Sequence, residues 1–133
     1  MRVEKLGLRP ATLAGLHTAG IVNVTQLTSH ACIELMQHPD IGPATVYEVI
    51  RRLHKHGLAL PNEWGIVRLP NERSIEMFRL RFVEGLSVTE TGRRFGVSRA
   101  RVYQILHAHF GISTLPDAAK ARERQRQGAG EGT

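Results

Sequence analysis

The 133-residue chain contains one cysteine, few aromatic residues and no long apolar run. The single cysteine, Cys32, excludes an internal disulfide and is typical of proteins in a reducing cytosol. Because only 5% of the residues are aromatic, we expect a core built mainly from leucine, isoleucine and valine. No apolar stretch approaches the roughly 20 residues that span a bilayer, and the first residues lack the apolar segment of a signal peptide. We therefore expect a cytoplasmic protein with no membrane partner.

The patterns of catalytic and metal sites are also missing. No phosphate-binding glycine motif, carboxylate cluster or activated nucleophile stands out. The pairs His54/His56 and His107/His109 are each two residues apart, so their side chains would point to different sides of a helix and make poor metal ligands. We predict a non-catalytic protein that needs no metal and no cofactor.

What the sequence has in excess is positive charge. Its net charge is +6, and the arginines between residues 93 and 101 have no acidic residue among them. These arginines are Arg93, Arg94, Arg99 and Arg101. Such a concentration favours a nucleic-acid backbone as partner, since that contact is mainly electrostatic. We expect a protein associated with the nucleoid, and we expect the other arginines between Arg68 and Arg101 to lie on solvated faces.

Glycines and prolines divide the first half of the chain into short helices. Pro10 suits the first turn of a helix and Gly20 its end. Two brief helices and then a longer one, over about 43–56, follow before Gly57. No stretch alternates as a strand would, so we predict an all-α fold. The residues expected to share one face of the first helix are Leu13, Leu16 and His17.

The composition predicts two helical modules followed by a tail. The proline-containing stretch LPNEWGIVRLPNE reads as a linker, with Trp64 at the seam between the modules. After Leu115 almost no apolar residue except alanine remains, which cannot offset the entropy of folding. The predicted divisions are a first module over 1–60, a linker over 61–70, a second module over 71–112 and a basic, largely disordered tail over 113–133.

The stretch EGLSVTETGRRFGVSRARVYQIL, residues 84–106, meets the requirements of a helix-turn-helix. Gly92 is the small residue needed where two steeply crossing helices touch, Gly96 tolerates the positive φ of the turn, and Ser98 can cap the second helix. The side chains expected to hold the two helices together are Phe95, Val97, Val102, Ile105 and Leu106. The side chains expected to face outward are Ala100, Tyr103, Gln104 and His107, flanked by Arg99 and Arg101.

A plainer interpretation is that this is an ordinary amphipathic helix pair, a motif that is common in proteins that never bind nucleic acid. It would leave the gathering of arginine, tyrosine and glutamine on one exposed face, without compensating acids, to chance. The helix-turn-helix interpretation explains that gathering. It meets one departure, Thr91, at a position where such pairs usually carry an aliphatic residue.

The residues RLRFVEGLSVTETGRRFGVSRARVYQI resemble region 4 of bacterial primary sigma factors, and the likeness extends over 69–110. It implies a recognition helix in the major groove of promoter DNA. The family reads Arg-Glu-Arg-hydrophobic-Arg-Gln, whereas Ala100 and Tyr103 stand here for the acid and the second arginine, so we expect an altered sequence preference. The base-reading residues would be Arg99, Ala100, Tyr103 and Gln104. The DNA-backbone contacts would come from Arg93, Arg94, Ser98, Arg101 and His107.

Residues 3–60 resemble the C-terminal domain of the bacterial RNA polymerase α subunit, and PDIGPAT within them reads as a helix-hairpin-helix turn. The family's DNA-contacting arginine, asparagine and lysine are all alanine here. We therefore expect a scaffold kept for packing or for a protein partner, with at most a weak phosphate contact. The positions replaced are Ala11, Ala14 and Ala44. The residues left for the phosphate contact are Gly42, Thr45 and Arg9.

The two resemblances imply a DNA-binding protein of bacterial transcription initiation that acts on double-stranded DNA. In sigma factors region 4 also docks on the β flap of RNA polymerase, so a polymerase contact is implied. One alternative is an adaptor or competitor of RNA polymerase that works mainly through protein contacts. Another is an accessory of a nucleic-acid enzyme that uses the hairpin turn. Because a lone reading helix of this size binds weakly, we expect either a homodimer or tethering to the polymerase.

Overall fold

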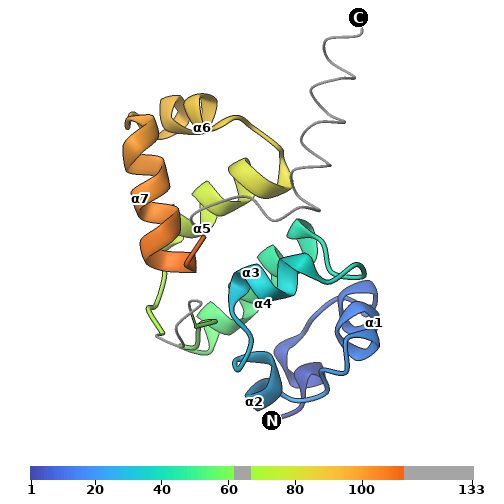
Figure 1. The fold of residues 1–133 in the computed structure, drawn as a ribbon. Coiled ribbons are helices and arrows are strands. Elements are labelled where there is room, and N and C mark those ends of the chain that lie inside the picture. The colour runs from blue at the N-terminus through green and yellow to red at the C-terminus, as the bar shows by residue number, and fades with distance from the viewer. Residues whose placement is uncertain (62–66, 113–133) are drawn as a thin grey trace, which may run out of the picture.

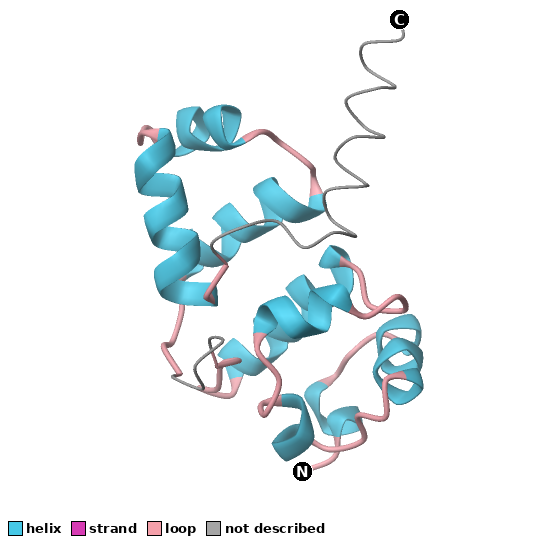
Figure 2. Ribbon diagram, viewed as in Figure 1, coloured by secondary structure: helices cyan, strands magenta, loops and turns pink. Residues whose placement is uncertain are grey.

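The computed structural model describes residues 1–61 and 67–112, which form an all-helical protein (Figure 1). Within these two ranges no strand occurs, and extended backbone pairs only at two isolated bridges, Arg2 with Asn23 and Pro61 with Val67 (Figure 2). The predicted all-α fold is confirmed. Trp64 and the predicted tail lie outside the described residues.

The helices of the first half begin and end where prolines and glycines place them. Pro10 and Pro43 stand at the first positions of α1 and α4, where a proline lacks no hydrogen bond that the helix needs. Gly20 and Gly57 follow these helices with φ of 80° and 70°, a conformation that glycine adopts without strain. The elements are η1 (Val3–Leu6), α1 (Pro10–Thr18), α2 (Val24–Leu27), α3 (Cys32–Gln37) and α4 (Pro43–Lys55).

The buried face of α1 differs from the one predicted. Leu16 is fully buried, but His17 is exposed, with its Nε2 atom 3.0 Å from Glu4 Oε1. Thr12, which lies one turn before Leu16, is buried instead. Its hydroxyl donates a hydrogen bond to Glu48 Oε2 on α4, so burial leaves the hydroxyl satisfied.

The second half begins with a helix that widens in its last turn. Asn71 caps α5 by accepting a hydrogen bond from Ser74 N at 2.8 Å. One turn of π-helix follows, in which Glu84 N donates to Arg79 O, five residues back, at 2.9 Å. Gly85, at φ 75°, then ends the helical run. The elements are α5 (Glu72–Phe78), η2 (Arg79–Val83), α6 (Val88–Phe95) and α7 (Arg99–Phe110).

One hydrophobic core joins the two halves, and α4 lies at its centre. This helix packs against α1 and α3 on one side and against α5 and η2 on the other (Figure 1). Val46, Val49 and Leu53 of α4 and Ile75 and Phe78 of α5 are all fully buried. The division into two modules stays a prediction, but the two halves are packed directly on each other.

An ion pair adds to this contact between the halves. Arg51 on α4 donates from Nη1 to Glu72 Oε2 on α5 at 2.6 Å and from Nε to the Tyr47 hydroxyl at 3.0 Å. The hydrogen bond to Glu72, opposed by burial and helped by Tyr47, raises the pKa of Arg51 above its ordinary value. The guanidinium therefore carries its charge at neutral pH, where it joins α4 to α5.

Glu48 ties the start of α1 to the middle of α4. Its carboxylate accepts hydrogen bonds from Arg9 N at 2.7 Å, from Arg9 Nε at 3.0 Å and from the Thr12 hydroxyl. Burial opposes the charged form, but these hydrogen bonds and the Arg9 charge outweigh it, so the pKa of Glu48 lies below its ordinary value. The carboxylate thus caps α1 from a residue 39 positions away.

We expect Glu48→Gln to lower the free energy of unfolding by about 2 kcal/mol at pH 7, because a charge-assisted cluster is lost. Since the folded state depresses the pKa of Glu48, its contribution is complete above the unfolded pKa and disappears as the pH falls through the folded one. The gap between wild type and variant should therefore shrink from pH 7 to pH 3 in urea titrations followed by circular dichroism. Glu34→Gln, at an exposed site on α3, is the control. A gap that does not change with pH would contradict this role.

Candidate nucleic-acid interface

The predicted helix-turn-helix consists of α6, a turn over 96–98 and α7. Val97 N donates to Gly92 O at 2.9 Å, and a Cβ atom added to Gly92 would lie 2.5 Å from Val97 O. Only glycine permits this approach of the turn to α6. Gly96 has φ 67°, and Ser98 Oγ accepts a hydrogen bond from Arg101 N at 3.1 Å at the start of α7. The roles predicted for these two glycines and for the serine cap are confirmed.

One side of α7 holds the helix to the rest of the protein. Val102, Leu106 and Phe110 are buried at helical spacing, against α6 and α5. The Phe110 ring lies 5.2 Å, between centroids, from that of Phe78 on α5. Ile105 is half-buried. This anchoring fixes the rotation of α7 about its axis and therefore decides which side chains face solvent.

The unexpected Thr91 behaves as a core residue of this motif. It is fully buried on α6, and its hydroxyl donates to Ser87 O, one turn back, at 2.8 Å. With the hydroxyl satisfied inside its own helix, the methyl group is left for packing. The departure from the aliphatic pattern therefore costs the fold little.

The side chains predicted to read bases are all exposed on α7. They are Arg99, Ala100, Tyr103 and Gln104. Arg101 Nη1 donates to Gln104 Oε1 at 3.4 Å, a long contact that leaves the Gln104 amide free to turn. Among residues 1–61 and 67–112, no acidic side chain is paired with Arg99. The exposed side of α7 therefore carries a positive charge without an acidic partner at its N-terminal end. The hydroxyl of Tyr103 and the amide of Gln104 lie one turn further along.

The side chains predicted to contact the DNA backbone are exposed as well, and they flank α7. They are Arg93, Arg94, Ser98, Arg101 and His107. The acidic residue Glu90 also lies among them, one turn of α6 before Arg93. It falls just outside residues 93–101, over which the sequence shows no acid. It is 3.5 Å from both Arg93 Nη1 and Arg94 Nε. Such exposed, long pairs are weak, so both arginines remain available to an anion.

Two further arginines take part in the motif, and the sequence did not reveal them. Arg73 at the start of α5 donates to Phe95 O at 3.1 Å and covers the Phe95 ring, 5.7 Å from its centroid, which fastens the end of α6. Arg81 was expected on a solvated face, but it is buried, with Nη1 donating to Leu86 O at 3.0 Å. Both contacts are with backbone carbonyls, for which no residue pattern exists.

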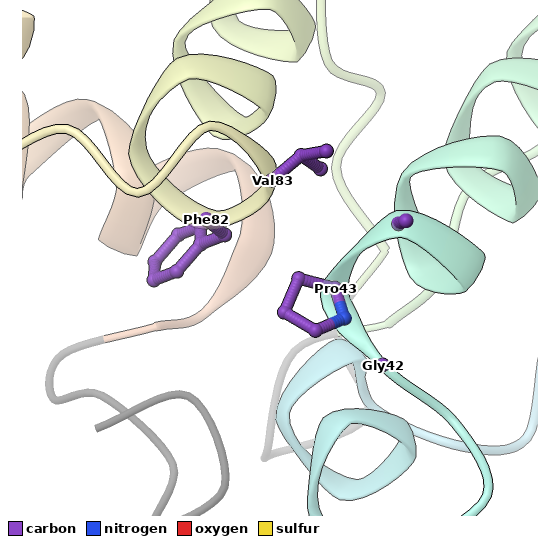
Figure 3. A pocket seen from close by; sticks show the side chains of 5 residues that line it. Gly42, Pro43, Phe82 and Val83 are labelled. Atoms are coloured by element: carbon purple, nitrogen blue, oxygen red, sulfur yellow. The ribbon is translucent and has the colours of Figure 1, made fainter. Parts of the chain in front are cut away.

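Among the residues that the structure describes, no basic side chain lines the cavity beside the weak phosphate site predicted in the first half. Gly42 precedes α4, and a shallow cavity of about 290 Å³ adjoins it (Figure 3). The lining is largely apolar, with Pro43 from α4 facing Phe82 and Val83 from η2 across the opening (Figure 3). Thr45 is half-buried on α4. The Arg9 guanidinium is engaged by Glu48, as described above. The phosphate contact stays a prediction without a gathered set of donors.

The described residues form neither a metal site nor a membrane span. No group of three or more histidine, cysteine, aspartate or glutamate side chains could hold a metal ion there. None of the helices described is long and apolar enough to cross a membrane. Cys32 is a buried core residue, as predicted, and burial raises the pKa of its thiol.

Comparison with known proteins identifies the second half only. Residues 70–108 match the family described as sigma-70, region 4, a helix-turn-helix DNA-binding domain of transcription initiation. This confirms the resemblance stated for residues 69–110. No curated protein and no solved structure matches the chain. The likeness of residues 3–60 to the α-subunit domain, including the helix-hairpin-helix turn, stays a prediction.

We expect Gly92→Ala to destabilise the protein by about 3 kcal/mol, because the added methyl group would press against the Val97 carbonyl rather than a movable side chain. Gly96→Ala is the matched variant, since its new methyl group would meet nothing within 4 Å and only the positive φ would be strained, at about 1 kcal/mol. Urea denaturation followed by circular dichroism compares the two. Equal losses would contradict the proposed contact.

Proposed function

We propose that the chain binds double-stranded DNA in a sequence-specific way, with α7 in the major groove, and that it does so in bacterial transcription initiation. The observation that carries the proposal is the exposed side of α7. Four candidate readers are exposed there, while Val102, Leu106 and Phe110 are buried and fasten the helix to the core. A helix is the element that fits a major groove, and base edges are read there by side chains on its outward face.

The side chains suit separate tasks. Arg99 can pair with the O6 and N7 atoms of guanine, and Gln104 with the N6 and N7 atoms of adenine, each pair being worth about 1–3 kcal/mol of discrimination. Arg93 and Arg94 lie on α6, at the end that meets the turn, where phosphates would flank the groove. Contacts with phosphates set position and affinity but carry no sequence information.

The first half is better suited to a protein partner than to DNA. Arg9 is held by Glu48, the three alanine positions of α1 and α4 are exposed without charge, and the cavity beside Gly42 is largely apolar. Region 4 domains bind RNA polymerase components as well as DNA. We therefore infer a second contact, with RNA polymerase, the β flap being the expected surface. This contact would tether a weak DNA reader, and self-association into a homodimer is the other means of doing so.

For DNA binding, we expect Arg99→Ala and Gln104→Ala to relax base preference, because each removes a donor set for one purine. Arg93→Ala should instead weaken binding about equally on all sequences and reduce the salt slope by about 1. Duplexes selected from a random pool and then tested by gel shift between 50 and 200 mM salt would measure both effects.

The control for charge is Lys5→Ala, because Lys5 lies in η1, at the other end of the molecule from α7 (Figure 1). It removes the same unit charge and should leave both base preference and salt slope unchanged. Unaltered base preference in Arg99→Ala and Gln104→Ala would show that α7 does not read bases.

For the polymerase contact, we expect the tagged full-length chain to capture purified bacterial RNA polymerase after nuclease treatment. Arg93→Ala should be captured equally well, because a protein contact does not depend on a phosphate-binding arginine. Capture that disappears with nuclease would mean that DNA alone links the two. In that case sedimentation of the free chain should reveal a dimer.

A further inference from the structure

Two side chains on the exposed side of α7 differ in kind from their neighbours. Ala100 and Tyr103 are one helical turn apart and therefore adjacent on the surface. We call this pair the apolar patch. Tyr103 is 46% exposed, one of few large apolar side chains left in solvent among the described residues. Arg99 and Gln104 border the patch, so an apolar area lies within an otherwise hydrogen-bonding surface.

The fold does not account for this exposure. Val102, Leu106 and Phe110 already anchor α7 from its other side. Within the part of the chain that the structure describes, the Tyr103 ring stacks on no aromatic ring, carries no guanidinium above it, and its hydroxyl has no hydrogen-bond partner. Ala100 ends at Cβ, so it lets the helix approach a surface closely at that point.

We propose that the apolar patch selects thymine, by packing Ala100 and Tyr103 against the C5-methyl groups of thymines in the major groove. This inference rests on the proposed DNA binding by α7. The thymine methyl is the apolar group among the donors and acceptors of the major-groove edges, and alanine and aromatic side chains are suited to contact it. Neither Arg99 nor Gln104 can detect it, since both act through hydrogen bonds to purines.

The geometry also sets where the thymines should lie. Ala100 and Tyr103 form a row along α7. Arg99 lies on one side of this row and Gln104 on the other. The selected site should therefore contain one or two thymines directly adjacent to the purines that Arg99 and Gln104 read. The positive charge of Arg93, Arg94, Arg99 and Arg101 around the patch commits it to a polyanion rather than to an apolar protein groove.

The experiment changes the DNA rather than the protein. After selection of duplexes with the full-length chain, each thymine of the selected site is replaced by deoxyuridine, which keeps base pairing and removes only the methyl group. We expect about a fourfold loss of affinity at each contacted thymine, the worth of one buried methyl group. Thymines outside the selected site, replaced in the same way, are the control.

Two variants separate the tyrosine ring from its hydroxyl. Tyr103→Phe keeps the apolar area, so replacing thymine by deoxyuridine should still lower the affinity of this variant. For Tyr103→Ala, the same replacement should leave the affinity unchanged at one thymine position. Ala100→Glu should exchange the thymine preference for cytosine, because a carboxylate accepts a hydrogen bond from cytosine N4. Both positions changed, 100 and 103, are exposed, so the fold should tolerate all three variants.

The possible results have distinct meanings. A chain that binds no duplex would overturn the proposed function itself. A chain that binds selected duplexes but is indifferent to deoxyuridine, or whose selected site contains no thymine, would overturn the apolar patch alone. If Tyr103→Phe loses the preference, the tyrosine acts through a hydrogen bond from its hydroxyl, and the inference is wrong in that case too.

Discussion

The approach of the turn to α6 at Gly92 is the contact on which the rest of the second half depends. Where the Val97 carbonyl would touch a Cβ atom, the two helices can cross only because no Cβ atom is present. That crossing brings Val102 and Leu106 into the core, and their burial fixes the rotation of α7. A rotation of one residue, about 100°, would carry Tyr103 inward and bring Val102 into solvent. The composition of the exposed surface is thus decided by one missing methyl group on another helix.

Local signals in the sequence were sufficient for the helix boundaries. Proline at the first helical position, glycine with positive φ after the last one, and asparagine or serine at the caps act within four residues of themselves. For this reason α1, α4 and the two helices of the motif begin and end close to the predicted places. The helix-turn-helix and its outward side chains could be predicted for the same reason, since spacing within one short segment determines them.

Contacts between distant residues could not be predicted in this way. His17 lies at a helical-wheel position expected of a core residue, yet it is exposed and Thr12 is buried instead. Thr12 can be buried because Glu48, 36 residues further along the chain, accepts a hydrogen bond from its hydroxyl. Arg81 is buried because a carbonyl in the next loop accepts its hydrogen bond. In both cases the partner is found only once the chain is folded, and a polar residue is then cheaper to bury than its type suggests.

The positive charges show the same difference between local signals and contacts of distant residues, and here the difference bears on function. In the sequence, both Arg9 and the arginines around the turn are candidates for contact with phosphate. In the folded chain Glu48 accepts hydrogen bonds from Arg9 Nε and from the Arg9 backbone N–H, so this charge is already partly neutralised. The arginines of α6 share one acid, Glu90, at 3.5 Å from each, and Arg99 has none among the described residues. Since phosphate affinity depends on charge that is not already neutralised, the proposed attraction for DNA is concentrated at the end of the molecule formed by α6 and α7. The other end packs against this one through α4 and α5, so a DNA contact by α7 would bring the first half close to the same site.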